Sequence, residues 1–240
     1  MWAKKLTDDA FAGFGKNHLS RIKTTLRKIE SSTVTYSIEL LTSTHLEWFT
    51  PLYNATIQVK NNPKVNDIFA TTLGKEAEYP YYILILKENN ISVGATIFAA
   101  RTKSLTFAYR IYPNEWQHNS LPAGPSLYTE YLMNVWAIEN GYSKISHGKD
   151  RNPYGINASI GLALFKLSVG CSIELPTGSY ETDTFDTDKV TTDTLIFEQP
   201  KEASKCITQA FLCVHKDTLF KYESIKKYDH TVVTTIVLRD

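Results

Sequence analysis

The chain has 240 residues, of which 42% are hydrophobic and 21% are charged, the balance of a globular protein long enough to bury a sizeable core. Its 26 lysines and arginines against 25 acidic residues leave a formal net charge of +1, so no global field draws it to nucleic acid or to a membrane surface. With only 11 glycines and 9 prolines, the composition also excludes a linker-like, collagen-like or intrinsically disordered chain.

The cysteines and the apolar runs bear on the cellular compartment in which the protein is expected. Cys171, Cys206 and Cys213 are an odd number without a C-x-x-C pair, which argues against a disulfide scaffold and against a zinc or redox site. The N-terminal lysines have no apolar run behind them, and the longest apolar stretch, at 81–86, is far shorter than a membrane span. We therefore expect a cytoplasmic protein with no membrane partner.

Helical periodicity marks the beginning of the chain. Leu19, Ile22, Leu26 and Ile29 recur at steps of three and four, which predicts an amphipathic helix over 16–30. The polar face of this helix is either a solvated surface or a patch for an anionic partner. Its basic residues are Lys16, Arg21, Lys23, Arg27 and Lys28.

The middle of the chain predicts a further helix and then three strands. The helix covers 44–59, with Pro51 in its first turns. Residues 80–90 and 91–101 are typical of two strands joined by a tight turn. Residues 104–112 alternate strictly, which predicts a half-buried strand and, with the previous two, an antiparallel meander. One face of this strand would carry Leu105, Phe107, Tyr109 and Ile111, and the other Thr106, Ala108 and Arg110.

The second half of the chain predicts another long helix. Gly124 and Pro125 open it in a favoured way, and Gly141 closes it with a residue suited to positive φ. Its apolar face would hold Leu127, Tyr131, Val135 and Ile138, widened by Leu132 and Trp136. The elements expected after it are a strand over 142–148, a helix over 158–170, a strand over 171–176, a loop or hairpin over 177–194, a helix over 201–220 and a last strand over 230–238.

This order of elements predicts an α/β fold in which helices cover a mixed sheet. We expect an N-terminal lead-in over 1–43, a core over 44–176, and a C-terminal helix-strand extension over 177–240 packed on the same domain. The loop that enters the helix at Gly124 is the predicted anion site, because free N–H groups and the macrodipole at a helix start favour phosphate.

One stretch resembles a known superfamily. It contains A-x-E-x-G at 137–141, Gly148 at the end of a strand, and the pair Phe165-Lys166 followed by Gly170. This pattern, over about residues 45–176, resembles the GNAT acyltransferase superfamily, in particular the subgroup similar to FemAB-type aminoacyl transferases and related acetyltransferase-like domains.

The resemblance implies the GNAT fold and transfer of an acyl group from a thioester donor, acyl-CoA or acetyl-CoA, to an amine by direct attack. Such chemistry needs a base for the ammonium proton and an acid for the leaving group. Candidates near the strand ends include Tyr109, Arg110, Lys149 and Asp150. The expected catalytic residues are His147 as a neutral-pH base, Tyr154 as the acid, and Tyr109. The expected donor-binding residues are Gln117, Leu121, Ala123, Gly124, Ser126 and Lys166.

Two other functions stay open beside this one. The chain is alternatively an aminoacyl-tRNA-dependent aminoacyl transferase, for which the basic helix at 16–30 is the hint, or a non-catalytic binding module with the same fold. The net charge of +1 favours a small donor over tRNA, since neutralising many phosphates needs many cations. The acceptor would be a small-molecule amine or a peptide.

We expect no metal cofactor. His147 and Asp150 lack a third ligand at useful spacing for zinc. The acidic run at 183–188 lacks the glycine and the terminal glutamate of an EF-hand loop.

Overall fold

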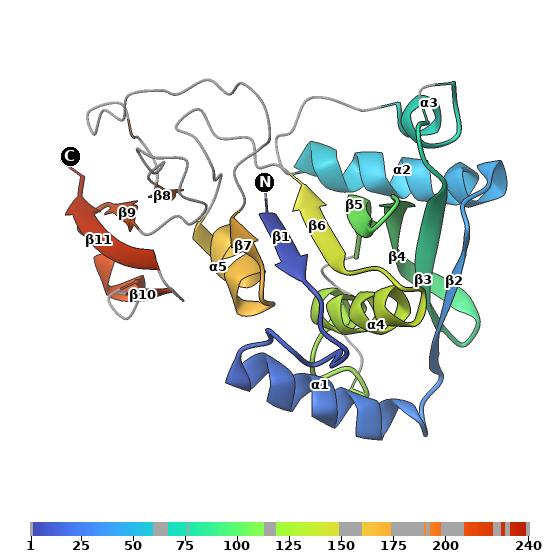
Figure 1. Ribbon diagram of the computed structural model, residues 1–240, viewed down its shortest axis with the longest axis horizontal. Helices are drawn as coiled ribbons and strands as arrows, with labels where there is room; N and C mark the ends of the chain where they lie inside the picture. The colour runs from blue at the N-terminus through green and yellow to red at the C-terminus, as the bar shows by residue number, and fades with distance from the viewer. Residues whose placement is uncertain are drawn as a thin grey trace. The chain divides into compact units, whose positions relative to one another are not determined.

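The computed structural model describes residues 2–59, 67–75, 77–112, 119–148, 160–173, 190, 193–197, 209–222, 227–228 and 231–238. The chain divides into two compact units, Lys4–Ser146 in one and Met1–Ala3 with His147–Asp240 in the other. The larger unit holds most of the helices and the meander (Figure 1).

The larger unit contains a mixed sheet in which neighbouring strands follow the order β2, β3, β4, β5, β6. The strands β2 (Val34–Leu40), β3 (Tyr81–Glu88), β4 (Ile91–Ala100) and β5 (Ser104–Ile111) pair antiparallel, and β6 (Lys144–Gly148) runs parallel to β5. Asn89 and Asn90 make the turn between β3 and β4 with φ of 50° and 65°, a backbone that asparagine tolerates and that tight hairpins need. The predicted meander is confirmed.

A bulge in β5 overturns the predicted alternation of that strand. Ile97 of β4 pairs with Tyr109, whereas the next residue, Phe98, pairs with Phe107, which leaves Ala108 as an extra residue. Paired residues share a face and consecutive residues do not. Phe107 and Tyr109 therefore lie on opposite faces of the sheet. The expectation that the four alternating apolar residues of β5 share one face is wrong, because the register with β4 imposes the bulge.

Helices cover both faces of this sheet. On one face, α2 (Ser43–Val59) and α3 (Ile68–Thr72) pack Phe49 and Ile68 against Ile83, Ile97 and their buried neighbours. On the other face, Trp136 of α4 (Pro125–Glu139) contacts the rings of Tyr82 and Phe98, with both centroid distances 5.2 Å. The helix α1 (Lys16–Ile29) runs beside α4. The predicted α/β class, a mixed sheet flanked by helices, is confirmed.

Two details of the predicted helices are wrong. Pro51 lies in the interior of α2 instead of in its first turns; its exposed position lets water replace the backbone hydrogen bond that proline cannot make. In α4 the deepest residues are not on the predicted apolar face, because the helix is covered on more than one side. They are Thr129, Glu130, Met133, Asn134 and Ala137, each at most 1% exposed.

In its described residues, the smaller unit contains short strands, the helix α5 and a 3-10 helix at Leu219–Lys221. Trp2 and Ala3 of β1 (Trp2–Lys5) pair antiparallel with β7 (Ser172–Ile173), and α5 (Ile160–Ser168) precedes β7. A second sheet has the order β10 (Lys227–Tyr228), β11 (Thr231–Val237), β9 (Gln209–Val214), β8 (Thr194–Phe197), with β9 and β11 parallel.

The C-terminal helix expected over 201–220 is wrong for residues 209–214. These residues form β9, and Cys213 packs in a small core with Val190, Ile196 and Leu238. A short apolar run fits a strand or a helix equally well by periodicity, and here the pairing with β8 and β11 decides. The last strand is confirmed as β11, whereas most of the predicted loop at 177–194 lies outside the described residues. Among the described helices, none has both the length and the apolar character that crossing a membrane requires.

Candidate functional site

A tight turn leads into α4. The N–H of Gly124 donates to the carbonyl of Leu121 at 2.8 Å, and Pro122 presets the second position of this turn. Gly124 has φ 75° and ψ 161°, and Pro125 follows at the first helical position. A Cβ at Gly124 would meet no heavy atom within 4 Å, so glycine is needed for its backbone conformation and not for space.

The start of α4 leaves two backbone donors open. Tyr128 makes the first helical hydrogen bond, from its N–H to the carbonyl of Gly124 at 3.1 Å. Helix geometry therefore gives the amides of Ser126 and Leu127 no acceptor within the helix, and the N-cap residue, Gly124, has no side chain to cap them. These amides and the positive end of the helix dipole suit an anion.

The end of β5 lies against the second turn of α4. Arg110 Nη2 is 2.7 Å from Glu130 Oε1, and the hydroxyl of Tyr112 is hydrogen-bonded to those of Thr129 and Thr96. Burial raises the pKa of the Tyr112 phenol, which keeps it neutral as a hydrogen-bonding group. The strand end and the helix start are thus joined by side chains from both elements.

The Arg110–Glu130 pair is unevenly buried. The Glu130 side chain is 2% exposed and that of Arg110 is 23% exposed, and the guanidinium lies 4.3 Å from the centroid of the Phe107 ring. A buried carboxylate needs a cationic partner. Since a guanidinium has five N–H donors, Arg110 can hold Glu130 and still present donors at the surface near the α4 start.

Gly94 of β4 makes room for this arrangement. A Cβ there would overlap the ring of Tyr112 and lie 2.9 Å from the carbonyl oxygen of Ile111. The close approach of the Tyr112 ring to the β4 backbone therefore depends on glycine.

The strands β5 and β6 pair only briefly in the described part of the chain. Their ladder joins Ser104–Thr106 to Lys144–Ser146, and the bulge at Ala108 follows directly. A bulge bends a strand and increases its twist, so β5 turns away from β6 before it reaches Arg110.

The structure places the predicted donor-loop residues together. Leu121 and Ala123 are buried, and Gly124 and Ser126 are partly buried at the start of α4. Gln117 and Tyr154 lie outside the described residues. Tyr109 lies on the opposite face of the sheet from α4, where its hydroxyl is 2.9 Å from Thr71 Oγ1 and its ring packs edge-to-face on Tyr53.

His147 and Lys166 belong to the smaller unit. His147 is half-buried at the end of β6, followed by Gly148 with φ 75°. The side chain of Lys166 is buried in α5, and its ammonium lies 5.3 Å from the ring centroid of Trp2. Within the described residues, no group of three or more His, Cys, Asp or Glu side chains is arranged to hold a metal ion.

Sequence reasoning missed the polar residues buried in α4. Glu130 and Asn134 are one helical turn apart, and the Asn134 amide donates to the carbonyl of Ala10 at 2.8 Å. Polar residues at i and i+4 between apolar residues on both sides are a signal that could have pointed to a buried polar stripe.

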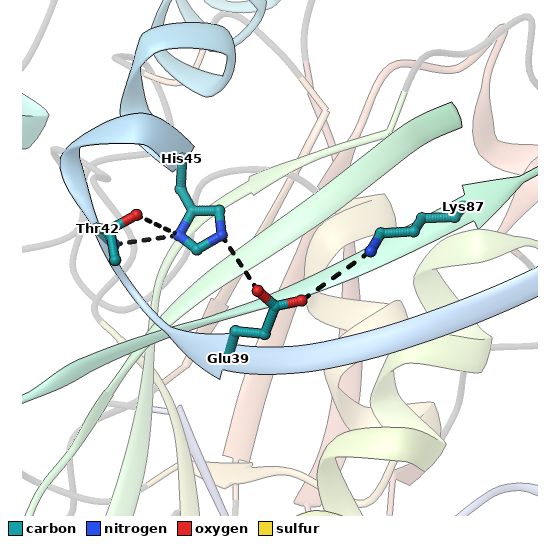
Figure 2. A network of polar contacts seen from close by, with 4 residues as sticks. All are labelled: Glu39, Thr42, His45 and Lys87. Atoms are coloured by element: carbon teal, nitrogen blue, oxygen red, sulfur yellow. Dashed lines mark hydrogen bonds and ion pairs between the residues drawn. The ribbon is translucent and has the colours of Figure 1, made fainter. Parts of the chain in front are cut away.

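A polar network of four residues lies at a second helix start, that of α2 (Figure 2); they are Glu39 of β2, Thr42, His45 and Lys87 of β3. The N–H of Thr42 donates to Nδ1 of His45 at 3.1 Å, and Nε2 of His45 lies 3.5 Å from Glu39 Oε2. Because an amide can only donate, Nδ1 is the acceptor and Nε2 carries the proton toward the carboxylate. His45, the third residue of the helix, thus makes one half of a capping box, the bond from the side chain of the third residue to the N–H of the residue before the helix.

Charges around Glu39 complete this network. Lys87 Nζ is 4.0 Å from Glu39 Oε1. The Ser37 hydroxyl, and then Lys87 and His45, lower the pKa of the Glu39 carboxyl. Both nitrogens of His45 are engaged, so the arrangement holds the helix start and leaves no free base there.

No family model and no curated protein matches the sequence. Among solved structures, the chain is similar to FemX (12% identity, TM-score 0.49), covering 71% of this chain and 58% of that one. It is also similar to L-PGS from Bacillus licheniformis (14%, TM-score 0.43), covering 70% and 52%. A third similar structure is the aminoglycoside N-acetyltransferase AAC(6')-Iy in complex with CoA (12%, TM-score 0.38), covering 63% and 97%.

The chain thus spans little more than half the length of FemX and of L-PGS. At such identities the likeness does not extend to individual residues, so the chemistry of the site stands on the residues of this chain.

Proposed function

We propose that the chain is an acyltransferase that moves an acyl group from a small thioester donor, acyl-CoA or acetyl-CoA, to a primary amine. The observation that carries the proposal is the open start of α4. Its amides at Ser126 and Leu127 have no acceptor within the helix, and the N-cap residue, Gly124, has no side chain to cap them. The partly exposed cation of Arg110 lies at the adjoining strand end. Phosphate groups suit backbone donors and a guanidinium.

The proposed reaction needs few catalytic groups. The amine nitrogen, once deprotonated, attacks the thioester carbonyl, the carbon–sulfur bond breaks, and a proton is delivered to the thiolate. His147 as the base and Tyr154 as the acid are part of the proposal, as are Gln117 and Lys166 as further donor ligands. A role for Lys166 would require its buried ammonium to leave the Trp2 ring. A role for Tyr109 would require its hydroxyl to leave Thr71.

The charge balance supports a small donor over charged tRNA. A formal net charge of +1 provides few cations for the many phosphates of an RNA backbone. Arg21, one of the basic residues of α1, donates to the carbonyls of Pro122 and Ala123, so its side chain has a role within the fold. A non-catalytic module would bind the same donor without turning it over.

The test is calorimetric binding of CoA and acetyl-CoA, followed by acetyl transfer to a panel of primary amines detected by mass spectrometry. The proposal predicts saturable binding of both and an acetylated amine for at least one acceptor. Absence of binding would overturn it, and binding without transfer to any amine would favour the non-catalytic module.

A filter-binding titration with tRNA at two ionic strengths tests the alternative. We expect weak binding at both. Tight binding at low salt that collapses as the salt rises would instead favour the aminoacyl-tRNA-dependent transferase.

A further inference from the structure

Two side chains of α1 hold the loop that opens α4. Arg21 donates from Nε to the carbonyl of Pro122 at 2.9 Å and from Nη2 to that of Ala123 at 3.2 Å. Thr25 Oγ1 accepts from the N–H of Ala123 at 3.0 Å. Because residues four apart lie on one side of a helix, Arg21 and Thr25 reach the loop together.

These contacts supply hydrogen-bond partners for backbone groups that the turn leaves unpaired. The bond from Gly124 to Leu121 closes the turn and leaves the carbonyls of the two central residues and the N–H of Ala123 unused. Ala123 is 4% exposed, so its N–H needs an acceptor inside the protein, and the fully buried Thr25 supplies it.

Arginine is suited to its part of this contact. Its planar guanidinium presents neighbouring N–H groups in a fixed geometry, which matches two successive carbonyls; a lysine ammonium has no such fork. Arg21 thereby fixes two consecutive peptide units, those on either side of Ala123, directly before Gly124.

We propose that Arg21 and Thr25 are positioning residues for donor binding. By holding the loop Leu121–Gly124, they keep Gly124 at φ 75° and ψ 161° and keep the amides of Ser126 and Leu127 presented to the donor. The basic helix α1 is in this respect a clamp on the donor loop. The inference rests on the proposed function for what the loop binds, but the clamp itself is a property of the free protein.

The test compares Arg21→Lys and Thr25→Val with two controls. Thr25→Ser keeps the hydroxyl acceptor. Arg27→Ala removes an exposed arginine of the same helix that donates to Lys23 and Thr24 within α1. The readouts are hydrogen exchange of the Ala123 and Gly124 amides in the free protein, and the Kd of CoA with the KM and kcat for acetyl-CoA.

We expect exchange at Ala123 and Gly124 to accelerate roughly tenfold in Arg21→Lys and Thr25→Val, in line with one lost hydrogen bond. The Kd of CoA and the KM for acetyl-CoA should rise by about the same factor, with kcat unchanged. Both controls should behave as the wild type. Arg21 is exposed, so Arg21→Lys gives a folded variant even if Thr25→Val does not.

Unchanged exchange at both amides in Arg21→Lys would overturn the clamp. A lower kcat with unchanged KM would overturn its role in donor binding. Hydrogen exchange needs no donor, so if CoA fails to bind the wild type, the proposed function fails while the clamp is still decided by the exchange rates.

Discussion

The starts of α2 and α4 solve the same physical problem in opposite ways. Both helices begin with backbone N–H groups that the helix cannot satisfy. At α2, the His45 ring accepts from the N–H of Thr42 and contacts Glu39, which in turn pairs with Lys87 (Figure 2). At α4, the N-cap residue Gly124 has no side chain to cap the helix, and side chains of α1 hold the preceding loop.

Under the proposed function, the two helix starts have different roles. At α2 a side chain accepts from the backbone N–H next to the helix, whereas at α4 the N-cap is a glycine without a side chain. An anionic ligand at the α4 amides, beside the partly exposed Arg110, would then contribute what a capping side chain contributes at other helix starts.

The largest expected effect concerns the ion pair next to the open start. Arg110→Met removes the guanidinium that pairs with the buried Glu130, and we expect a loss of about 3 kcal/mol in the free energy of unfolding. Urea unfolding at pH 7 measures it. Arg110→Met combined with Glu130→Leu should recover most of the loss; a double variant as unstable as the single one would contradict the assignment.

The next prediction compares the two glycines that flank α4. Gly124 and Gly141 both have φ 75° and open space for a Cβ, so an alanine at either should cost about 1–2 kcal/mol of stability through backbone strain. Gly141 lies in a C-terminal motif closed by Tyr142 N–H to Ala137 O at 2.8 Å. Only Gly124→Ala should also weaken CoA binding. The Kd should rise roughly tenfold, as expected when one hydrogen bond between the donor and the start of α4 is lost. Equal loss of CoA affinity in Gly141→Ala would mean that the effect is global.

Breaking the capped start should affect stability alone. His45→Ala removes the acceptor for the Thr42 amide, and we expect a loss of about 1 kcal/mol in thermal or urea unfolding. CoA affinity should equal that of the wild type. A matching drop in CoA affinity would show that the two helix starts are coupled.

The smallest effect is the pH dependence of the same network. The pKa of Glu39 is lowered in the folded protein, so its contribution is present above the unfolded pKa and is lost as the pH falls through the folded one. Since the carboxylate is 45% exposed, the contribution is about 0.3–0.5 kcal/mol. Urea midpoints of Glu39→Gln and wild type should differ at pH 6 and converge near pH 3. A difference between the two urea midpoints that stays the same at both pH values would contradict a contribution from the ionised Glu39.

Local signals predicted the frame of the molecule, and long-range contacts decided the rest. The meander, the turn at Asn89–Asn90 and the two ends of α4 follow from periodicity and glycine placement. The bulge at Ala108 does not, because it arises from the register with β4. Residues 209–214 are apolar enough for a helix or a strand, and only the neighbouring strands decide between them.

For the candidate site, the sequence predicted the position of the helix start at Gly124, because helix starts have a local signature. The binding role of this loop stays a prediction. The partner of Glu130 and the targets of Arg21 lie far away in sequence, so a basic helix face gave no sign that one of its arginines is directed at backbone carbonyls.

The most direct test of the open start is a ¹H–¹⁵N titration of the whole chain with CoA. The amide resonances of Ser126 and Leu127 should shift saturably with a single Kd, while those of Thr44 and His45 at the capped start of α2 stay in place. Saturable binding that leaves Ser126 and Leu127 unmoved would contradict the assignment of the donor site to the start of α4.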